Sequence, residues 1–398
     1  MTFREYKRRL REALKGGKIA EAVGRARSSY RKNIAQALEE FPHTLDLAKE
    51  VRRIKEEAIS RMEELVEEAR QRMERNHIRT FVARTASEAC EIIASLCGRG
   101  KVIVKGKSLT SEEIDLREHL ERLGNEVYET DLGELLVQLL RSRPMHLLAP
   151  AVHLTKEEVS ELLSRFLGKE VPPEVEAEVR AVREFLREKF VRADVGITGA
   201  NVVAAETGTI VQIENEGNVR LCSSLPPVHI TLVGMEKVVP RLEDALKVAE
   251  VTWRYANYTV PAYVNLISSP SKTGDIEKVT TYGAHGPREV YCVFLDNGRL
   301  ELSRSPFREA LYCLRCGGCL YECPLFGLVA GYFGDRYFGG IGALWTAFVT
   351  GGLEDAAPLA YSCLACGRCK VRCPMEIDTP GMCLELRRLI AEGDRRPS

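Results

Sequence analysis

This sequence lacks an excess of charge of either sign. Its 57 Lys and Arg residues balance 57 Asp and Glu residues, so the formal net charge is zero. Proteins that bind nucleic acid or an anionic membrane through their overall charge carry a basic excess, so we expect no nucleic-acid partner. The basic N-terminus is followed by no apolar core of the kind that a secretory signal needs, which predicts a cytoplasmic protein.

A long apolar run is absent as well. Residues 337–353 form an uncharged stretch of 17 residues, but the stretch contains five glycines. A membrane-spanning helix needs about 20 predominantly apolar residues. We therefore expect no transmembrane segment and interpret the stretch as a buried or partner-facing connection, with a membrane-inserted loop as the alternative.

Motifs of nucleotide-binding and hydrolytic enzymes are also missing. Lys105, Gly106, Lys107 and Ser108 resemble the end of a phosphate-binding loop, but the glycine that opens such a loop is absent. No catalytic triad or zinc-protease motif appears. Lys105 and Lys107 are still expected to face an anionic ligand at the start of the next helix, where backbone N–H groups favour negative charge.

Cysteine, in contrast, is abundant near the C-terminus. Eight of the 13 cysteines fall in two windows that each read C-x2-C-x2-C-x3-C-P. Bacterial-type ferredoxins bind [4Fe-4S] clusters with this spacing, and the fourth cysteine of each run binds the other cluster. We therefore predict two [4Fe-4S] clusters with exchanged fourth ligands. The first has Cys313, Cys316, Cys319 and Cys373, and the second has Cys363, Cys366, Cys369 and Cys323.

Other uses of these eight cysteines are less favoured. Structural zinc also binds four thiolates, but zinc sites usually draw on two separated cysteine pairs, whereas here three cysteines recur at intervals of three residues, twice over. A disulfide framework is disfavoured because no secretory signal accompanies the cysteines. Clusters in a reducing compartment are therefore the leading interpretation, and zinc is the alternative.

The pattern of apolar residues divides the chain into three predicted parts. Residues 1–75 have the periodicity of amphipathic helices. Residues 76–300 alternate short β-branched runs with helical segments, which predicts an α/β fold with a mixed or parallel sheet flanked by helices. Residues 301–398 are predicted to form an α-helical ferredoxin domain, because the 39 residues between the two cysteine motifs are mostly helical in composition.

Two local predictions concern the α/β part. Residues 101–106 and 126–130 are predicted strands, joined by a helix with Ser111 as its N-cap. Residues 216–218 have good turn chemistry and are predicted to join strands at 209–213 and 219–222 as a hairpin.

Polar residues gather in the loops that follow the predicted strands. Ligands of open α/β sheets bind at the carboxyl ends of the strands, so these residues are expected to line an anion- or hydroxy-acid-binding crevice. Glu206 is the candidate catalytic residue of this crevice. The candidate substrate-binding residues are Lys105, Lys107, Ser108, Asn201, Thr207, Asn215, His229 and His285.

Several segments together resemble a known family, the iron–sulfur B subunit of the bacterial and archaeal lactate-utilization proteins. The resemblance covers nearly the whole chain beyond the first forty residues. It rests on the two cysteine motifs and on residues 102–139, 146–159, 196–221, 226–240 and 285–287.

The resemblance implies a LUD domain, with a fold similar to that of sugar isomerases, CoA-transferases and formyltetrahydrofolate cyclo-ligases, joined to a helical ferredoxin domain. It also implies a complex with a Cys-rich A subunit and a smaller LUD-type C subunit that oxidises L-lactate to pyruvate. The first hypothesis is therefore an electron-transfer subunit of a 2-hydroxy-acid oxidising complex. One alternative is a CoA-transferase- or ligase-like enzyme that uses Glu206 and has structural clusters. Another is a redox-sensing scaffold.

Overall fold

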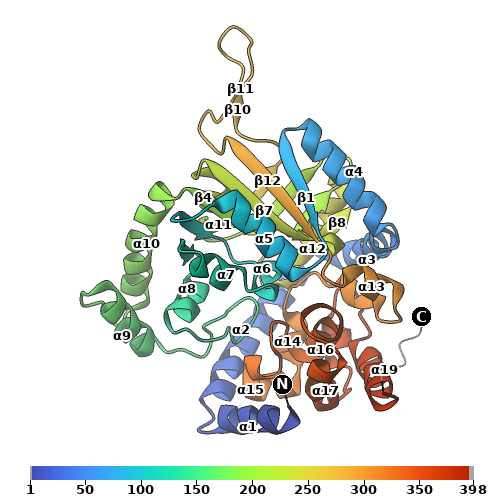
Figure 1. Cartoon of the computed structure of the whole chain (residues 1–398). Coiled ribbons are helices and arrows are strands. Elements are labelled where there is room, and N and C mark those ends of the chain that lie inside the picture. The colour runs from blue at the N-terminus through green and yellow to red at the C-terminus, as the bar shows by residue number, and fades with distance from the viewer. Residues whose placement is uncertain (1, 394–398) are drawn as a thin grey trace.

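A six-stranded sheet lies at the centre of the molecule (Figure 1), for which the computed structural model describes residues 2–393. All neighbouring strands in this sheet run parallel, as expected when helical crossovers connect successive strands. The strands, in spatial order, are β1 (Ile78–Ala83), β12 (Glu289–Leu295), β7 (Val228–Gly234), β4 (Val195–Thr198), β2 (Val102–Lys105) and β3 (Glu126–Glu129).

Both faces of this sheet are covered, because successive side chains of a strand point to opposite faces. In β12, Tyr291 and Val293 pack with one set of helices, while Cys292 and Phe294 belong to the core on the other side. The first face is covered by α5 (Ala86–Cys97), α6 (Leu109–Glu113) and α7 (Leu116–Arg122). The opposite face packs on α4 (Met62–Arg75), α10 (Val175–Arg192) and α11 (Asn218–Ser224). The helices α8 (Leu132–Leu139) and α9 (Lys156–Leu167) share a buried cluster with α10, and α12 (Leu242–Tyr255) contacts the second sheet instead.

A second, mixed sheet of four strands lies against α12. Its order is β8 (Val238–Val239), β5 (Val202–Ala204), β6 (Thr209–Glu214) and β9 (Tyr263–Ile267), and the short 3-10 helix η1 (Met235–Lys237) leads into it. Beyond β9, the strands β10 (Lys272–Thr273) and β11 (Thr281–Tyr282) form an arm that projects from the body of the molecule (Figure 1).

The helices α1 and α2 lie with the C-terminal helices below the main sheet, whereas α4 lies beside β1 (Figure 1), and α2 contacts both α14 and α15. The N-terminal helices are α1 (Phe3–Leu14), α2 (Lys18–Glu40), α3 (Thr44–Ser60) and α4 (Met62–Arg75). The C-terminal elements are α13 (Arg299–Arg304), η2 (Arg308–Tyr312), α14 (Gly318–Glu322), α15 (Pro324–Val329), η3 (Ala330–Tyr332), α16 (Gly339–Trp345), η4 (Thr346–Thr350), α17 (Leu353–Ser362), α18 (Arg368–Arg372) and α19 (Thr379–Ala391).

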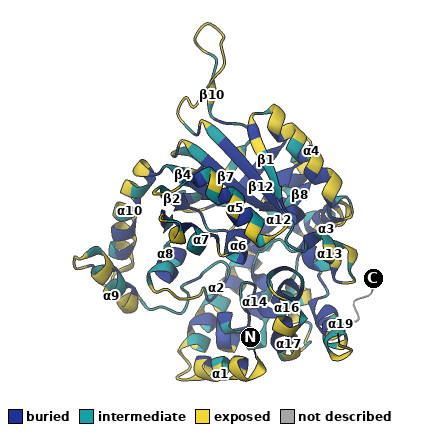
Figure 2. Cartoon of the chain, viewed as in Figure 1, coloured by how far each residue is buried: buried dark blue, intermediate teal, exposed yellow. Residues whose placement is uncertain are grey.

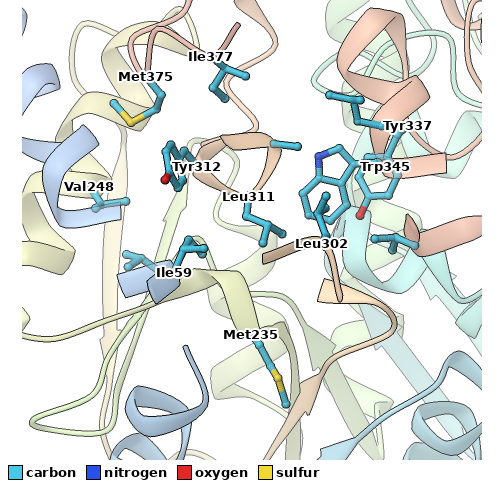
Figure 3. Packing of buried hydrophobic residues seen from close by; sticks show 14 of the residues in the cluster. Ile59, Met235, Val248, Leu302, Leu311, Tyr312, Tyr337, Trp345, Met375 and Ile377 are labelled. Carbon is cyan, nitrogen blue, oxygen red and sulfur yellow. The ribbon is translucent and has the colours of Figure 1, made fainter. Parts of the chain in front are cut away.

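One continuous apolar core joins these regions. Ile59 from α3, Val248 from α12, Leu311 from η2 and Trp345 from α16 belong to the same cluster of buried side chains (Figure 3). Figure 2 shows the same arrangement at the scale of the fold, with the central strands buried and the outward faces of α1, α4 and α9 exposed. The division of the chain at residues 75 and 300 stays a prediction, because this core crosses both boundaries.

The fold confirms the predicted α/β class with a parallel sheet, a helical N-terminus and a helical C-terminal region. Residues 337–353 form the buried helix α16 and the π-helical turn η4, as expected for a buried connection. Of the helices in residues 2–393, none combines the length and apolar character that crossing a membrane requires.

Two local predictions were wrong. Residues 216–218 do not form a hairpin turn, because Asn218 begins helix α11 and β6 pairs with β9 instead. The Glu214 carboxylate accepts hydrogen bonds from the N–H groups of Val219 and Arg220, both at 2.8 Å, and so stabilises the start of this helix. Ser111 is also not an N-cap, since α6 begins at Leu109 and Ser108 occupies the N-cap position.

Candidate iron–sulfur centre and adjoining cavity

The two cysteine motifs adopt the same backbone path. Arg315 and Ala365, each two residues after the first cysteine of its motif, have positive φ angles of 61° and 50°. Gly317 and Gly367 follow with φ angles of 75° and 79° and precede the short helices α14 and α18, which contact each other. A positive φ is uncommon for a residue with a Cβ, so its recurrence at both motifs shows that the loop conformation is specifically stabilised.

We call the two predicted ligand sets the first and the second cysteine group, and in each set a cysteine of one motif acts electrostatically on cysteines of the other. Burial raises the pKa of Cys316 to about 12, and negative charge on Cys373 and Cys313 adds to the rise. The pKa of Cys319 is likewise raised by burial and then by Cys313, Cys316 and Cys373.

The second group has the reciprocal composition. Burial raises the pKa of Cys369 to about 12, and negative charge on Cys363, Cys323 and Cys366 adds to the rise. One small cavity is lined by Cys323, Cys363, Cys366 and Cys369, and also by Cys319 of the first group. The grouping is the one that exchanged fourth ligands would require.

The surroundings of the sulfurs suit thiolates that bind iron. Backbone N–H groups donate to cysteine sulfurs in both motifs, from Gly318 to Cys316 and from Ala365 to Cys363, for example. Such hydrogen bonds stabilise the thiolate form and tune cluster potentials. All eight thiols are free, so the donor set fits two four-thiolate clusters. Within residues 2–393, no three His, Cys, Asp or Glu side chains are arranged to hold a single metal ion.

A buried cation lies beside the first cysteine group. The Arg315 guanidinium stacks 3.7 Å from the ring centre of Trp345 and 4.6 Å from that of Tyr337. It also forms an ion pair with Glu236 at 3.3 Å. A positive charge near a cluster that carries net negative charge favours its reduced state. Arg315 is therefore positioned to raise the potential of the first cluster.

Next to Arg315 lies a cavity of about 240 Å³ at the carboxyl ends of the sheet strands. Its wall includes Lys107 and Ser108 after β2, Asp131 after β3 and Ala200 after β4. Cys313, Leu314 and Arg315 form another part of the same wall. The crevice expected from the fold therefore exists, and it reaches the first cysteine of the first motif.

Two lysines bring positive charge into this cavity. Lys55 from α3 is buried, and its ammonium donates to the backbone carbonyl of Glu236. Lys237 from η1 donates to the backbone carbonyl of Ala200 at 2.7 Å. Burial lowers the pKa of both lysines to about 8, against an opposing effect of the nearby Glu236 charge.

Four of the eight candidate substrate-binding residues line the cavity: Lys107, Ser108, Asn201 and Asn215. The other four lie elsewhere. Lys105 is fully buried and paired with Glu129 and Glu112, at 2.9 and 2.8 Å. Thr207 bonds to Thr209 at 2.8 Å, and His285 is exposed near the projecting arm.

His229 is fully buried in the main sheet, where its Nε2 lies 2.8 Å from the Thr198 hydroxyl. Burial lowers its pKa to about 3, so the ring is neutral near neutral pH. His229 is therefore not placed to bind substrate as expected, because both faces of β7 are covered.

The expected position of Glu206 in the crevice is corrected by the structure. Glu206 is exposed, and its carboxylate accepts a hydrogen bond from the N–H of Leu242 at 2.7 Å. It satisfies a free N–H group at the start of α12, which is a common use of an acidic side chain at a helix N-terminus. Because Glu206 lies outside the cavity, it is not placed to act on a substrate bound there.

Sequence reasoning missed most of the cavity wall, including the polar residues Lys55, Lys237 and Gln212. Lys55 does carry a signal, because it lies on the apolar stripe of α3 between Val51 and Ala58. A charged residue at such a position is rarely buried without a partner. Lys237 and Gln212 carry no comparable signal, since their burial depends on contacts with distant segments.

The fold and the cysteine arrangement define an α/β domain joined to an iron–sulfur domain of the dicluster type. The LUD domain family matches residues 66–295, and the 4Fe-4S dicluster domain family matches residues 309–377. A protein named Lactate utilization protein B from Bacillus subtilis is 32% identical over 396 residues, which cover 98% of this chain and 81% of that protein.

A protein named Uncharacterized electron transport protein YkgF from Escherichia coli is also 32% identical, over 98% of this chain and 81% of that protein. A solved structure of a DUF162 family protein from Deinococcus radiodurans is 15% identical and covers 59% of this chain and 98% of that chain, with a TM-score of 0.32. The chain belongs to the lactate utilization protein B family, in which a LUD domain and an iron–sulfur domain are combined.

Proposed function

We propose that this chain is the iron–sulfur electron-transfer subunit of a cytoplasmic complex that oxidises L-lactate to pyruvate. One observation carries the proposal. The cavity at the carboxyl ends of the sheet strands has Cys313, the first proposed cluster ligand, in its wall. A compound bound in the α/β domain would therefore lie beside the first electron acceptor. The relatives support the proposal, since one is named for lactate utilization and another for electron transport.

Residues of this chain would perform three tasks in that function. The two groups of four cysteines hold two clusters, which supply one-electron transfer when bound. Arg315 supplies a buried positive charge beside the first group. The apolar side chains of α16, including the buried Ala343 and Leu344, keep water away from the region between the motifs.

The same pathway implies partners. We propose that a Cys-rich A subunit and a smaller LUD-type C subunit complete the complex, since one chain with two one-electron centres needs both a source and an acceptor of electrons. The rival assignment, a CoA-transferase-like enzyme, is weakened by the surface position of Glu206.

The test is anaerobic co-purification of the complex from its native host. The isolated chain should contain about eight iron atoms, and reduction should give the EPR signals of two four-iron clusters. Addition of L-lactate to the complex should bleach the cluster absorption in the visible range. Tight zinc with no iron, or clusters that lactate never reduces in the complete complex, would rule the proposal out.

A further inference from the structure

The cavity contains two lysines without an ion pair, because the nearby Glu236 carboxylate is already paired with Arg299 and Arg315. Lys55 is 3% exposed, and within residues 2–393 no Asp or Glu oxygen forms an ion pair with its ammonium or with that of Lys237. Each ammonium has three N–H donors, and the structure uses one from each lysine, toward the carbonyls of Glu236 and Ala200. A buried charge is costly unless an opposite charge meets it, so this cavity is built for an anion.

Four buried polar atoms in the same wall also lack a hydrogen-bond partner: Lys107 Nζ, Ser108 Oγ, Gln212 Oε1 and Trp253 Nε1. The Ser108 hydroxyl and the Gln212 carbonyl oxygen form no hydrogen bond, although these residues are only 7% and 1% exposed. The Gln212 amide nitrogen donates to the Gly199 carbonyl at 2.9 Å, which fixes the orientation of the amide. Its oxygen Oε1 can therefore only accept a hydrogen bond, so a ligand that binds to it must be a hydrogen-bond donor.

These groups lie close together around one short segment. A Cβ added at Gly199 would lie 2.5 Å from the Ser108 hydroxyl, so this hydroxyl is next to the Gly199 backbone. Gln212 bonds to the Gly199 carbonyl, and Lys237 bonds to the next carbonyl, that of Ala200. Lys55 bonds to the carbonyl of Glu236, the residue before Lys237. Cations, a hydroxyl and a free acceptor thus converge on one side of the cavity.

We propose that this cavity binds a small 2-hydroxy monocarboxylate, with its carboxylate against Lys55 and Lys237 and its hydroxyl donating to Gln212 Oε1. The cavity volume of about 240 Å³ lies below the roughly 300–1,000 Å³ of sites for drug-sized ligands, which suits a small metabolite. Asp131, Glu214 and Glu216 line the remaining wall and disfavour a second negative group. The proposal rests on the proposed function and names the binding residues of its site.

Calorimetric titration of the anaerobic, cluster-containing protein tests the proposal with L-lactate, pyruvate and inorganic phosphate as separate ligands. L-lactate should bind, pyruvate should bind more weakly because it cannot donate to Gln212, and phosphate should not compete. Lys55→Gln and Lys237→Gln should each weaken lactate binding by roughly 10- to 100-fold, as expected for loss of a charged hydrogen bond. Lys49→Gln, on the same helix as Lys55 but exposed, should leave binding unchanged.

Gln212→Met is the specificity variant. It should weaken lactate binding and leave pyruvate binding nearly unchanged, because only lactate donates a hydroxyl hydrogen. Unchanged iron content serves as the folding control for every variant. Lys237 is partly exposed, so its variant remains informative if loss of the buried Lys55 impairs folding.

The outcomes separate this proposal from the proposed function. If the wild-type protein binds no lactate while the complete complex still reduces its clusters with lactate, the cavity assignment fails and the electron-transfer function stands. Phosphate binding as tight as lactate binding would also overturn the carboxylate assignment. A third outcome is that the Lys55 and Gln212 variants weaken lactate binding, but lactate does not reduce the clusters of the complete complex. This result would support the binding site and rule out the proposed function.

Discussion

The pairing of individual cysteines is the first question at the scale of single residues. Cys316 lies with Cys313 and Cys373, whereas Cys323 lies with Cys363 and Cys369. The spacing in the sequence predicts this exchange, because three closely spaced thiolates bind one cluster and the Cys-Pro step directs the fourth away. Substitutions in pairs can test the assignment.

Cys316→Ala combined with Cys373→Ala should remove two ligands of one cluster and leave about four iron atoms per chain in the other. Cys316→Ala combined with Cys323→Ala should damage both clusters and leave fewer. Iron analysis and visible absorption of anaerobically purified protein measure the difference. Cys97→Ala, at a buried position in α5, is the control and should keep about eight iron atoms. Retention of one cluster in the second pair and not in the first would mean that fourth ligands are not exchanged.

His229 should make the stability of the protein sensitive to acid. Its pKa is lowered to about 3 by burial, whereas the pKa of an unfolded histidine is about 6.5. Because the pKa is lower in the folded state, His229 stabilises the folded protein fully above about pH 6.5, and this stabilisation is lost progressively as the pH falls toward 3. Between about pH 8 and pH 5.5, His229 should lower the free energy of unfolding by about 1.4 kcal/mol.

His229→Asn should therefore reduce the pH dependence of the unfolding free energy by about that amount. Denaturant unfolding at both pH values gives the comparison. His285→Asn serves as the control, because His285 is exposed and its substitution should leave the pH dependence unchanged. If the unfolding free energy changed equally with pH in wild type and in His229→Asn, this would contradict the neutral, buried state of the histidine.

At the scale of elements, β2 ends in a buried ion cluster. Burial alone would lower the pKa of Lys105, but the charges of Glu112 and Glu129 raise it above its ordinary value. From the sequence, Lys105 was expected to bind an anionic ligand. The sequence could not show that Glu129, from the neighbouring strand β3, already neutralises that lysine in the register of the sheet.

Lys105→Met should destabilise the fold by roughly 3–5 kcal/mol, because it leaves Glu129 buried without its cation. Adding Glu129→Leu should restore part of the loss, since both partners are then apolar. Thermal or denaturant unfolding measures both effects. Lys101→Met, at an exposed ion pair just before β2, should cost less than about 1 kcal/mol. A loss of that small size for Lys105→Met would show that the buried pair is not needed.

Local signals predicted some elements better than others. The strands predicted at residues 101–106 and 126–130 are present as β2 and β3. The hairpin predicted at 216–218 was wrong because the deciding contacts are made by the side chain of Glu214. Turn chemistry identified the change of direction after β6, but the element that follows depends on a cap and on strand pairing that residue types alone do not specify.

At the scale of the whole molecule, a buried network connects the α/β domain to the iron–sulfur region. Arg299 bonds to both oxygens of Glu113, at 2.8 and 2.7 Å, and also pairs with Glu236. Tyr337 donates to Glu113 at 2.6 Å, and Arg315 pairs with Glu236. Glu113 ends α6 and Glu236 lies in η1 after β7, whereas Tyr337 precedes α16 and Arg315 lies between Cys313 and Cys316.

Arg299→Met should break this connection. Two buried carboxylates would lose their main cation, so the expected loss is roughly 3–5 kcal/mol, with separate unfolding transitions for the two regions in calorimetry. Arg304→Met, at an exposed ion pair on the same helix, is the matched control and should change little. A single transition at the wild-type temperature would contradict a coupling role for Arg299.

The fold class, the family and the cysteine groups could be inferred from the sequence, because each depends on periodicity or close spacing along the chain. The cavity could be predicted only in outline. Its position at the strand ends follows from the fold, and Lys107 and Ser108 follow β2 directly. Lys55 and Cys313 reach it from opposite ends of the chain, and only the packing of α3 against η2 brings those segments together.

The backbone repeat of the two motifs also bears on how the protein matures. In the proposed pairing, neither motif supplies all four ligands of a cluster, and 39 residues of chain lie between Cys323 and Cys363. During synthesis, the first motif emerges from the ribosome long before Cys373 exists. Neither cluster can then be completed until both motifs have been synthesised, so we expect iron–sulfur insertion to be a concerted event that follows folding of the LUD domain.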